Sequence, residues 1–243
     1  LFRSEPGRRI VQSGARVVEV NRPSADVAIV TLQVVQPEFS FEAGQYAEVV
    51  MRDGTRRCYS MANAPDGQGR VEWHVRRIEG GRFSAHVYDK LKARDLLRIE
   101  GPFGTFKLRA GDAPIVLLAS GTGYAPIAAL LATHGDELAR RGAVLYWGGR
   151  RIGDLYGVSS VAEWEAAHPG VRIVPVLSVP DEPWSGRRGL VHQAVLDDLP
   201  DLSAHEVYAC GNPLMIDAAR DSFTAQARLP VDNFFADAFL FKA

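Results

Sequence analysis

The chain has 243 residues, which exceeds one typical domain and predicts two. Apolar residues make up 47% of the sequence, enough for a core in each domain. The formal net charge of −1 argues against a nucleic-acid-binding protein that relies on neutralising phosphates. No apolar run approaches the roughly 20 residues of a membrane-spanning helix.

Cys58 and Cys210 are the only cysteines in the sequence. An iron–sulfur cluster of the plant ferredoxin type needs about four thiolates, so this chain alone does not supply one. We expect two reduced thiols in a cytoplasmic protein, and a disulfide between them is the alternative. The 6 histidines show no metal-ligand spacing, and we expect them on the surface or in packing.

Residues 1–14 are polar, rich in arginine and without periodicity. That composition predicts a linker-like N-terminal segment. Because the chain begins with Leu1 rather than Met, we expect the segment to be the cut end of a longer polypeptide, with a processed N-terminus as the alternative.

Residues 15–109 predict a β domain. Short runs rich in valine are bounded by turn residues, which is the pattern of strands in a small antiparallel barrel. Val71, Trp73 and Val75 alternate with polar residues, so we expect them on one face of a strand. The expected strands cover residues 15–20, 27–35, 46–51, 71–78 and 96–99, and the one expected helix covers 84–91.

The pattern changes after a break at residues 109–112. Residues 115–119 form a continuous apolar run, as in a strand with both faces covered. Strands and helices then alternate, which predicts a doubly wound parallel sheet in a nucleotide-binding α/β domain over residues 110–243. The expected strands cover 115–119, 143–147, 171–177 and 206–209, and the expected helices begin at 126 and cover 161–167, 190–196 and 213–227.

A turn containing Gly121, Thr122 and Gly123 follows the first strand of this second domain. Two glycines permit a tight turn and the close approach of a diphosphate. Pro126 suits the first turn of a following helix, whose N-terminus attracts anions. We therefore expect the turn to bind a nucleotide. An ordinary strand-to-helix turn is the alternative, because the third glycine of the common dinucleotide motif is absent.

The four residues from Arg57 through Cys58 and Tyr59 to Ser60 offer a guanidinium, an aromatic ring and a hydroxyl. Arg57 suits a phosphate and Tyr59 suits packing on a flat ring. Ser60 suits a hydrogen bond to a heteroatom of that ring, such as flavin N5. The set fits a phosphorylated aromatic cofactor, and plain strand residues are the alternative.

A second candidate anion site runs from Gly81 through Arg82 and Phe83 to Ser84, just before the predicted helix. Ser84 is also expected to be the N-cap of that helix, and this role alone would explain it. Two phosphate sites in two differently built domains favour two nucleotides over one. Together the sites suggest a flavin facing a nicotinamide, because hydride transfer between two flat rings needs each ring to be held by its own site.

Cys210 follows an apolar run, so we expect its thiol at the carboxyl edge of the sheet, where ligands bind. A small buried hydrophobe is the alternative. Asn212 and Pro213 have the residue types of an N-cap and a first helical position. Arg150 and Arg151 follow another predicted strand, where they are either surface residues or within reach of a nucleotide phosphate.

These motifs, in this order and spacing, resemble the ferredoxin–NADP reductase superfamily. The resemblance is to the flavin reductase modules of bacterial oxygenases and of deoxysugar dehydratase reductases, and it extends from Ala15 to Phe239. The segments that carry it are residues 41–46, 57–60, 81–84, 101–104, 121–126 and 210–213.

The resemblance implies a flavin-binding antiparallel β-barrel followed by a doubly wound parallel-sheet domain that binds NAD(P). It assigns the FAD diphosphate to Arg57 and the turn at 81–84, and the isoalloxazine ring to Tyr59 and Ser60. The expected catalytic residues are Ser60, Cys210 and Asp237. The expected cofactor-binding residues are Arg57, Cys58, Tyr59, Ser60, His74, Val75, Arg76, Gly81, Arg82, Phe83, Ser84, Gly121, Thr122, Gly123, Arg150, Cys210, Gly211 and Phe239.

The function that the resemblance implies is hydride transfer from NAD(P)H to FAD. Single electrons then pass to a [2Fe–2S] ferredoxin domain or partner of an oxygenase-type system. NADH is the expected donor with NADPH as the alternative, and FMN is the alternative to FAD. Two other functions remain open, a free NAD(P)H:flavin reductase and a flavin-binding sensor or subunit without hydride transfer. No nucleic-acid or membrane partner is expected.

Overall fold

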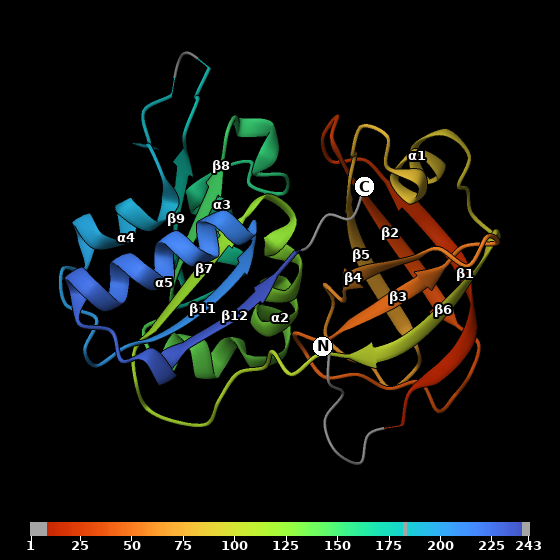
Figure 1. Cartoon of the computed structure of the whole chain (residues 1–243), viewed down its shortest axis with the longest axis horizontal. Coiled ribbons are helices and arrows are strands. Elements are labelled where there is room, and N and C mark those ends of the chain that lie inside the picture. The colour runs from red at the N-terminus through yellow and green to blue at the C-terminus, as the bar shows by residue number, and fades with distance from the viewer. Residues whose placement is uncertain (1–8, 182–183, 240–243) are drawn as a thin grey trace. The chain divides into compact units, whose positions relative to one another are not determined.

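The computed structural model describes residues 9–181 and 184–239. Contacts between Cα atoms divide the chain into two compact units, and the main boundary between them lies between Leu108 and Arg109. In Figure 1 the first unit runs from red to yellow and the second from green to blue. Among the described helices, none has the length and hydropathy needed to cross a membrane.

The first unit is an antiparallel six-stranded sheet that curls into a nearly closed barrel (Figure 1). Its strand order is β4-β3-β6-β1-β2-β5, so β4 and β5 are the two edges. One isolated bridge, between Met61 and Trp73, joins the chain after β4 to β5. The elements are β1 (Val11–Asn21), β2 (Val27–Val34), β3 (Tyr46–Val50), β4 (Arg56–Ser60), β5 (Arg70–Arg76), α1 (Arg82–Asp89) and β6 (Leu96–Phe103).

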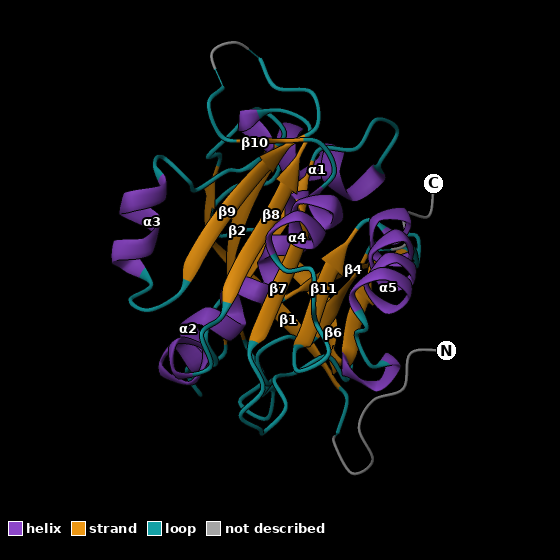
Figure 2. Ribbon diagram, turned by 90° about the vertical axis from the view of Figure 1, so that its left-hand side faces the viewer, coloured by secondary structure: helices purple, strands orange, loops and turns teal. Residues whose placement is uncertain are grey.

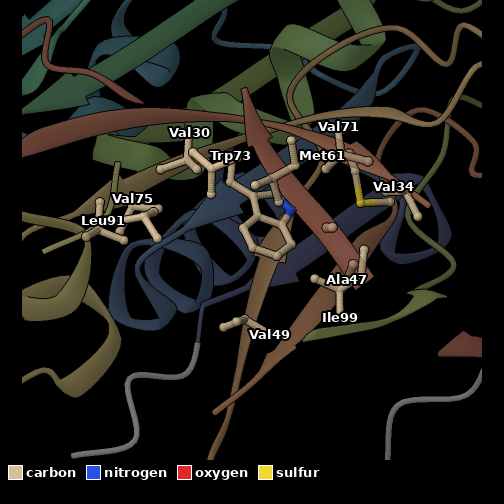
Figure 3. Close-up of a cluster of buried hydrophobic side chains, with 14 of the residues drawn as sticks. Val30, Val34, Ala47, Val49, Met61, Val71, Trp73, Val75, Leu91 and Ile99 are labelled. Carbon is tan, nitrogen blue, oxygen red and sulfur yellow. The ribbon is translucent and has the colours of Figure 1, made fainter. Parts of the chain in front are cut away.

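The barrel core follows from period-two alternation along the strands. Val71, Trp73 and Val75 are all fully buried, which confirms the face expected from the sequence. Figure 3 shows Trp73 among side chains from β2, β3 and β6, including Val30 and Ile99. The strand that carries Trp73 is therefore anchored by the largest side chain of the core.

The second unit is a parallel six-stranded sheet of order β10-β9-β8-β7-β11-β12 (Figure 2). Chain order reverses between β7 and β11, because successive strands are added on one side of β7 up to β10 and on its other side from β11 onward. The strands are β7 (Ile115–Ser120), β8 (Val144–Gly149), β9 (Arg172–Leu177), β10 (Arg187–Arg188), β11 (Glu206–Gly211) and β12 (Phe234–Ala238).

Helices and short 3₁₀ turns connect these strands. Apolar residues of α4 and α5 form one buried cluster with the sheet, and the near-complete burial of β7 indicates that both of its faces are covered. These features confirm the predicted fold class, a β-barrel followed by a doubly wound sheet. The connecting elements are η1 (Gly121–Gly123), α2 (Tyr124–Arg140), η2 (Ile152–Asp154), α3 (Val161–Ala167), α4 (Val191–Asp198), α5 (Pro213–Ala227) and η3 (Val231–Asn233).

The N-terminal part of β1 corrects the prediction of a linker-like segment up to residue 14. Residues Val11–Gly14 are strand, and Ser13 pairs with Ile99 of β6. The side chain of Ser13 is buried, with its hydroxyl bonded to Gly14 O at 2.7 Å and to Gln36 N at 3.0 Å. Because the polar residue Ser13 takes an inward position, the apolar and polar residues of this segment do not alternate as the prediction of a strand requires. Residues 1–8 lie outside the described residues.

Three further strands were not predicted. We expected residues 57–60 at the end of an apolar strand, but they are themselves part of β4, an edge strand of the barrel whose residues are mostly polar. The other two are the edge strands of the parallel sheet, β12, which contains Asp237, and the two-residue β10. None of the three has the apolar pattern on which the prediction depended, whereas β5, also an edge strand, has it in Val71, Trp73 and Val75.

Candidate functional site

An aromatic cluster joins β4, β5 and α1 in the barrel unit. The ring centroid of Tyr59 lies 5.4 Å from that of Trp73 and 5.3 Å from that of Phe83. Burial raises the pKa of the Tyr59 phenol, so this side chain is neutral and packs as a ring. The neighbouring Ser60 is buried at the end of β4. Tyr59 and Ser60, two of the predicted flavin contacts, are thus held at the edge where the barrel closes.

Strand alternation separates the other two residues of this motif. Arg57 is half-buried, and its guanidinium donates to the carbonyl of Arg56 at 2.9 Å. Cys58 is exposed, with its Sγ 3.6 Å from Oε1 of Glu48. Arg57 shares a strand face with Tyr59, and Cys58 has the opposite face. The structure therefore groups Cys58 with an acidic side chain of β3 rather than with the aromatic cluster.

The predicted segment His74–Arg76 forms the end of β5, the other edge of the sheet. Val75 is fully buried in the core. The His74 ring is almost completely buried, and its Nε2 lies 3.2 Å from Oε1 of Glu72 on the same strand face. Because Trp73 pairs with Met61, this strand faces the chain that leaves β4.

The turn before α1 differs from the prediction in one respect. Gly81, not Ser84, is the N-cap of α1. Ser84 is buried inside the first turn, where its hydroxyl accepts a hydrogen bond from Ile78 N at 3.2 Å and donates one to Gly81 O at 3.0 Å. A Cβ on Gly81 would lie 2.5 Å from that hydroxyl, so the close packing of the turn requires glycine here. The sequence places Ser84 correctly in the turn but three residues too late for a cap.

Arg82 places the start of α1 near the turn that leads into β4. Its guanidinium bonds the carboxylate of Asp53 and the hydroxyl of Thr55. The first N–H groups of a helix have no partner within the helix and carry partial positive charge. The guanidinium groups of Arg57 and Arg82 and the N–H groups at the start of α1 are hydrogen-bond donors that fit the diphosphate of FAD. The ring of Tyr59 fits the flat ring of the same cofactor.

The second candidate site lies at the carboxyl ends of β7 and β11, where the strand order of the sheet reverses. This switch point is where open parallel sheets bind ligands. The turn Gly121–Gly123 is a buried 3₁₀ helix that leads directly into α2. A Cβ on Gly123 would lie 2.1 Å from the carbonyl oxygen of Cys210, so the glycine is required by close contact between the two strand ends.

Two residues to which the sequence analysis assigned no role hold this turn in place. The hydroxyl of Ser120 accepts a hydrogen bond from Asn212 N at 2.9 Å, which links the ends of β7 and β11. The indole Nε1 of Trp147 donates to Gly121 O at 3.0 Å. Trp147 also stacks on Tyr124 with ring centroids 4.0 Å apart. Trp147 lies in an apolar strand, where its type signalled only packing.

Cys210 is fully buried and pairs in register with Asp237 of the neighbouring β12. Burial, and then the charge of Asp237, raise the pKa of the thiol well above its ordinary value, so the group is protonated at neutral pH. The N–H of Phe239 donates to Gly211 O at 2.8 Å. Cys210, Gly211, Asp237 and Phe239 are thereby brought together at one corner of the sheet.

The remaining predicted residue, Arg150, follows β8. Its N–H donates to Oδ2 of Asp154 at 2.8 Å, and its side chain is exposed. The neighbouring Arg151 is engaged by Asp181 at 3.3 Å. Asn212 caps α5 by accepting from Leu214 N at 2.9 Å, as predicted. Within the described residues, no group of three or more histidine, cysteine or acidic side chains is arranged to hold a metal.

Two domain families match the two units. Residues 14–108 match the oxidoreductase FAD-binding domain, and residues 117–221 match the oxidoreductase NAD-binding domain. The reductase component 2 of terephthalate 1,2-dioxygenase from Comamonas sp. is 35% identical over 228 residues, which cover 93% of this chain and 67% of that protein. The chain belongs to the ferredoxin reductase-like family of FAD- and NAD-binding oxidoreductases. Its two units are thus an FAD-binding domain and an NAD-binding domain of the oxidoreductase type.

Other members of this family are also similar. The CDP-6-deoxy-L-threo-D-glycero-4-hexulose-3-dehydrase reductase of Yersinia pestis is 44% identical over 217 residues. These cover 88% of the present chain but 65% of that protein, so the chain spans less than two thirds of its length. The chain is 35% identical to the Amycolatopsis cytochrome P450 reductase GcoB, whose crystal structure it matches with a TM-score of 0.85 over 95% of this chain and 70% of that chain.

Proposed function

We propose that this reductase takes hydride from NAD(P)H onto FAD and passes the electrons singly to a [2Fe–2S] ferredoxin domain or partner of an oxygenase-type system. The observation that carries the proposal is the presence of two sites of different construction. One is the closing edge of a barrel with arginines and an aromatic ring, and the other is the switch point of a parallel sheet. NADH is the proposed donor.

In the barrel unit, we assign the FAD diphosphate to Arg57 and the turn from Gly81 to Ser84. Arg57 is accessible on the strand face of Tyr59, and the start of α1 offers N–H groups to an anion. The isoalloxazine ring is assigned to Tyr59, Ser60 and the strand His74–Arg76. Bound FAD would supply the conversion of a two-electron hydride into two single-electron steps.

In the sheet unit, we assign the NAD(P)H diphosphate to the turn Gly121–Gly123 and the nicotinamide to the corner formed by Cys210 and Gly211. The neutral thiol places a small polarisable group there without adding a charge. Asp237, one strand away, supplies the negative charge of this corner. Arg150 is assigned to the adenosine half of the nucleotide, since its guanidinium is exposed at the carboxyl end of β8.

The names of the relatives support the proposed acceptor. They include reductase components of a dioxygenase and of an aromatic O-demethylase, and a ferredoxin reductase in a carbazole dioxygenase. Oxidation of one NAD(P)H would reduce two one-electron acceptors and release one proton. The acceptor is proposed to be a ferredoxin domain, on the same polypeptide or on a separate one.

The test is anaerobic titration of the FAD-loaded protein with NADH and, separately, with NADPH. We expect NADH to bleach the flavin absorbance, and added [2Fe–2S] ferredoxin to restore it with two clusters reduced per NADH. An unbleached flavin would refute the enzyme assignment and leave a flavin-binding sensor or subunit. Loss of reduced flavin from the protein on gel filtration would instead identify a free flavin reductase.

A further inference from the structure

The two strands that carry the assigned flavin residues are joined by few backbone hydrogen bonds. β4 and β5 are opposite edges of the sheet, so the barrel closes only where the chain after β4 approaches β5. Met61 forms the isolated bridge with Trp73, and Ala62 N donates to Glu72 O at 2.9 Å. Beyond Ala62 the chain no longer runs as a strand.

The side chain of Asn63 continues the closure where the backbone stops. Its Oδ1 accepts a hydrogen bond from Glu72 N at 2.8 Å, and its Nδ2 donates to Arg70 O at 3.0 Å. The same Nδ2 donates to Ala64 O at 2.9 Å. One carboxamide therefore offers β5 both an acceptor and a donor, as the peptide group of a paired strand would.

These bonds act close to the candidate flavin residues on both strands. Asn63 lies three positions after Ser60, and Glu72 lies two positions before His74. β4 and β5 are not paired by a ladder of backbone hydrogen bonds. The spacing of Ser60 from His74 therefore depends on the few hydrogen bonds that Met61, Ala62 and Asn63 form with β5. Without Asn63, the Glu72 N–H would lose its partner and the closure would be shorter by two bonds.

We propose that Asn63 is a positioning residue for the flavin, which holds the closing edges of the barrel at the spacing that the isoalloxazine ring requires. The proposal rests on the proposed function, because it takes FAD as the ligand of this edge. Asn63 would act through the strands and not by touching the ring. Its effect should therefore appear in the affinity and the electronic environment of the flavin as well as in stability.

The test compares Asn63→Ala and Asn63→Asp with Gln33→Ala in the full chain. Gln33 is a matched control, because its Nε2 also bonds a backbone carbonyl in the same hairpin, that of Gln68 at 2.6 Å. Asn63→Ala removes both bonds to β5. Asn63→Asp keeps an acceptor for Glu72 N but loses the donor to Arg70 O. The first readout is the FAD dissociation constant, from titration of each apoprotein. The other two are the visible spectrum and the midpoint potential of the bound flavin, measured with each protein saturated with FAD.

We expect Asn63→Ala to raise the FAD dissociation constant about tenfold, the effect of losing one or two hydrogen bonds. The spectrum and potential of the bound flavin should shift as well, with Asn63→Asp intermediate and Gln33→Ala like the wild type. If Asn63→Ala does not fold, the same comparison is made with Asn63→Asp. An FAD affinity, spectrum and potential equal to those of Gln33→Ala would overturn the proposal. Failure of the wild type to bind FAD would instead overturn the proposed function.

Discussion

Arg56 and Arg57 are neighbours in β4, yet their side chains leave the strand on opposite faces. Arg56 is held by Glu48 and Glu100, each at 2.8 Å, which raise the pKa of its guanidinium further. Arg57 instead bonds a backbone carbonyl and shares its face with Tyr59. The surroundings of the two residues make Arg57 the candidate phosphate ligand and Arg56 part of the barrel's outer surface.

Arg57→Ala should therefore weaken FAD binding, whereas Arg56→Ala should not. Hydrogen bonds to charged groups contribute about 1.5–3 kcal/mol, which corresponds to an increase of about 10- to 100-fold in the FAD dissociation constant. Fluorescence titration of the apoprotein with FAD measures it. Equal affinities in the two variants would show that Arg57 holds no phosphate.

Cys210 gives a prediction about alkaline stability. Its pKa is raised in the folded chain, so above about pH 8.5 the unfolded chain loses a thiol proton that the folded chain keeps. The contribution of the protonated Cys210 thiol to the free energy of unfolding is complete below that pH. It is lost as pH rises, by at most about 1.4 kcal/mol per pH unit. Cys210→Ala should flatten the fall in the free energy of unfolding above that pH.

Urea unfolding at pH 7, 9 and 10 measures this slope, and Cys58→Ala is the control because its thiol is exposed. Because the Cys58 thiol reaches solvent in the folded chain, its removal should leave the slope unchanged. If the free energy of unfolding of both variants depends on pH as that of the wild type does, burial of Cys210 does not raise the pKa of its thiol.

At the scale of elements, a buried polar network fixes the segment that leads into β7. The guanidinium of Arg141 is completely buried and pairs with Oε2 of Glu206 at 2.7 Å. It also donates to the carbonyls of Arg109 and Ala113, at 2.9 Å and 2.7 Å. The hydroxyl of Tyr208 donates to Glu206 at 2.7 Å and accepts from Arg109 N at 2.9 Å. This network attaches residues 109–113 to α2 and β11.

Glu206→Ala should destabilise the protein strongly, because it leaves the Arg141 charge buried without its partner. Breaking a buried pair in this way costs about 3–5 kcal/mol. Asp112→Ala is the matched control, since it removes an exposed ion pair with Arg140 that should contribute about 0–1 kcal/mol. Chemical denaturation monitored by circular dichroism gives both values. A loss for Glu206→Ala as small as that for Asp112→Ala would contradict the role of the network.

The elements that the sequence predicted well are those with a regular apolar pattern. The helices over 161–167 and 213–227 have the predicted bounds, and Asn212 is the predicted cap of the second. The edge strands β4, β10 and β12 escaped prediction because they lack a regular apolar pattern, which the edge strand β5 has. Asn63 and Trp147 escaped for another reason. Their roles depend on hydrogen bonds to the backbone of other elements, β5 for Asn63 and the turn Gly121–Gly123 for Trp147, which residue type alone does not reveal.

At the scale of the whole molecule, each candidate site is built inside one unit. The barrel unit supplies the closing edge of β4 and β5 with α1, and the sheet unit supplies the switch point between β7 and β11. The matched domain families divide the chain in the same way, with residues 14–108 in one and residues 117–221 in the other. The binding of FAD and the binding of the adenosine diphosphate half of NAD should therefore respond to different substitutions.

This independence is tested with ADP-ribose, which contains the diphosphate and adenosine of NAD but no nicotinamide. Trp147→Phe keeps the aromatic packing but removes the donor to Gly121 O, so the glycine turn loses one of its supports. One such hydrogen bond contributes about 1 kcal/mol, so the ADP-ribose dissociation constant should rise about fivefold while FAD affinity stays unchanged. Arg57→Ala should show the reverse pattern. Calorimetric titration of each variant with each ligand measures the four constants. Loss of both affinities in either variant, with folding intact, would show that the two ligands share residues and that the sites are not separate.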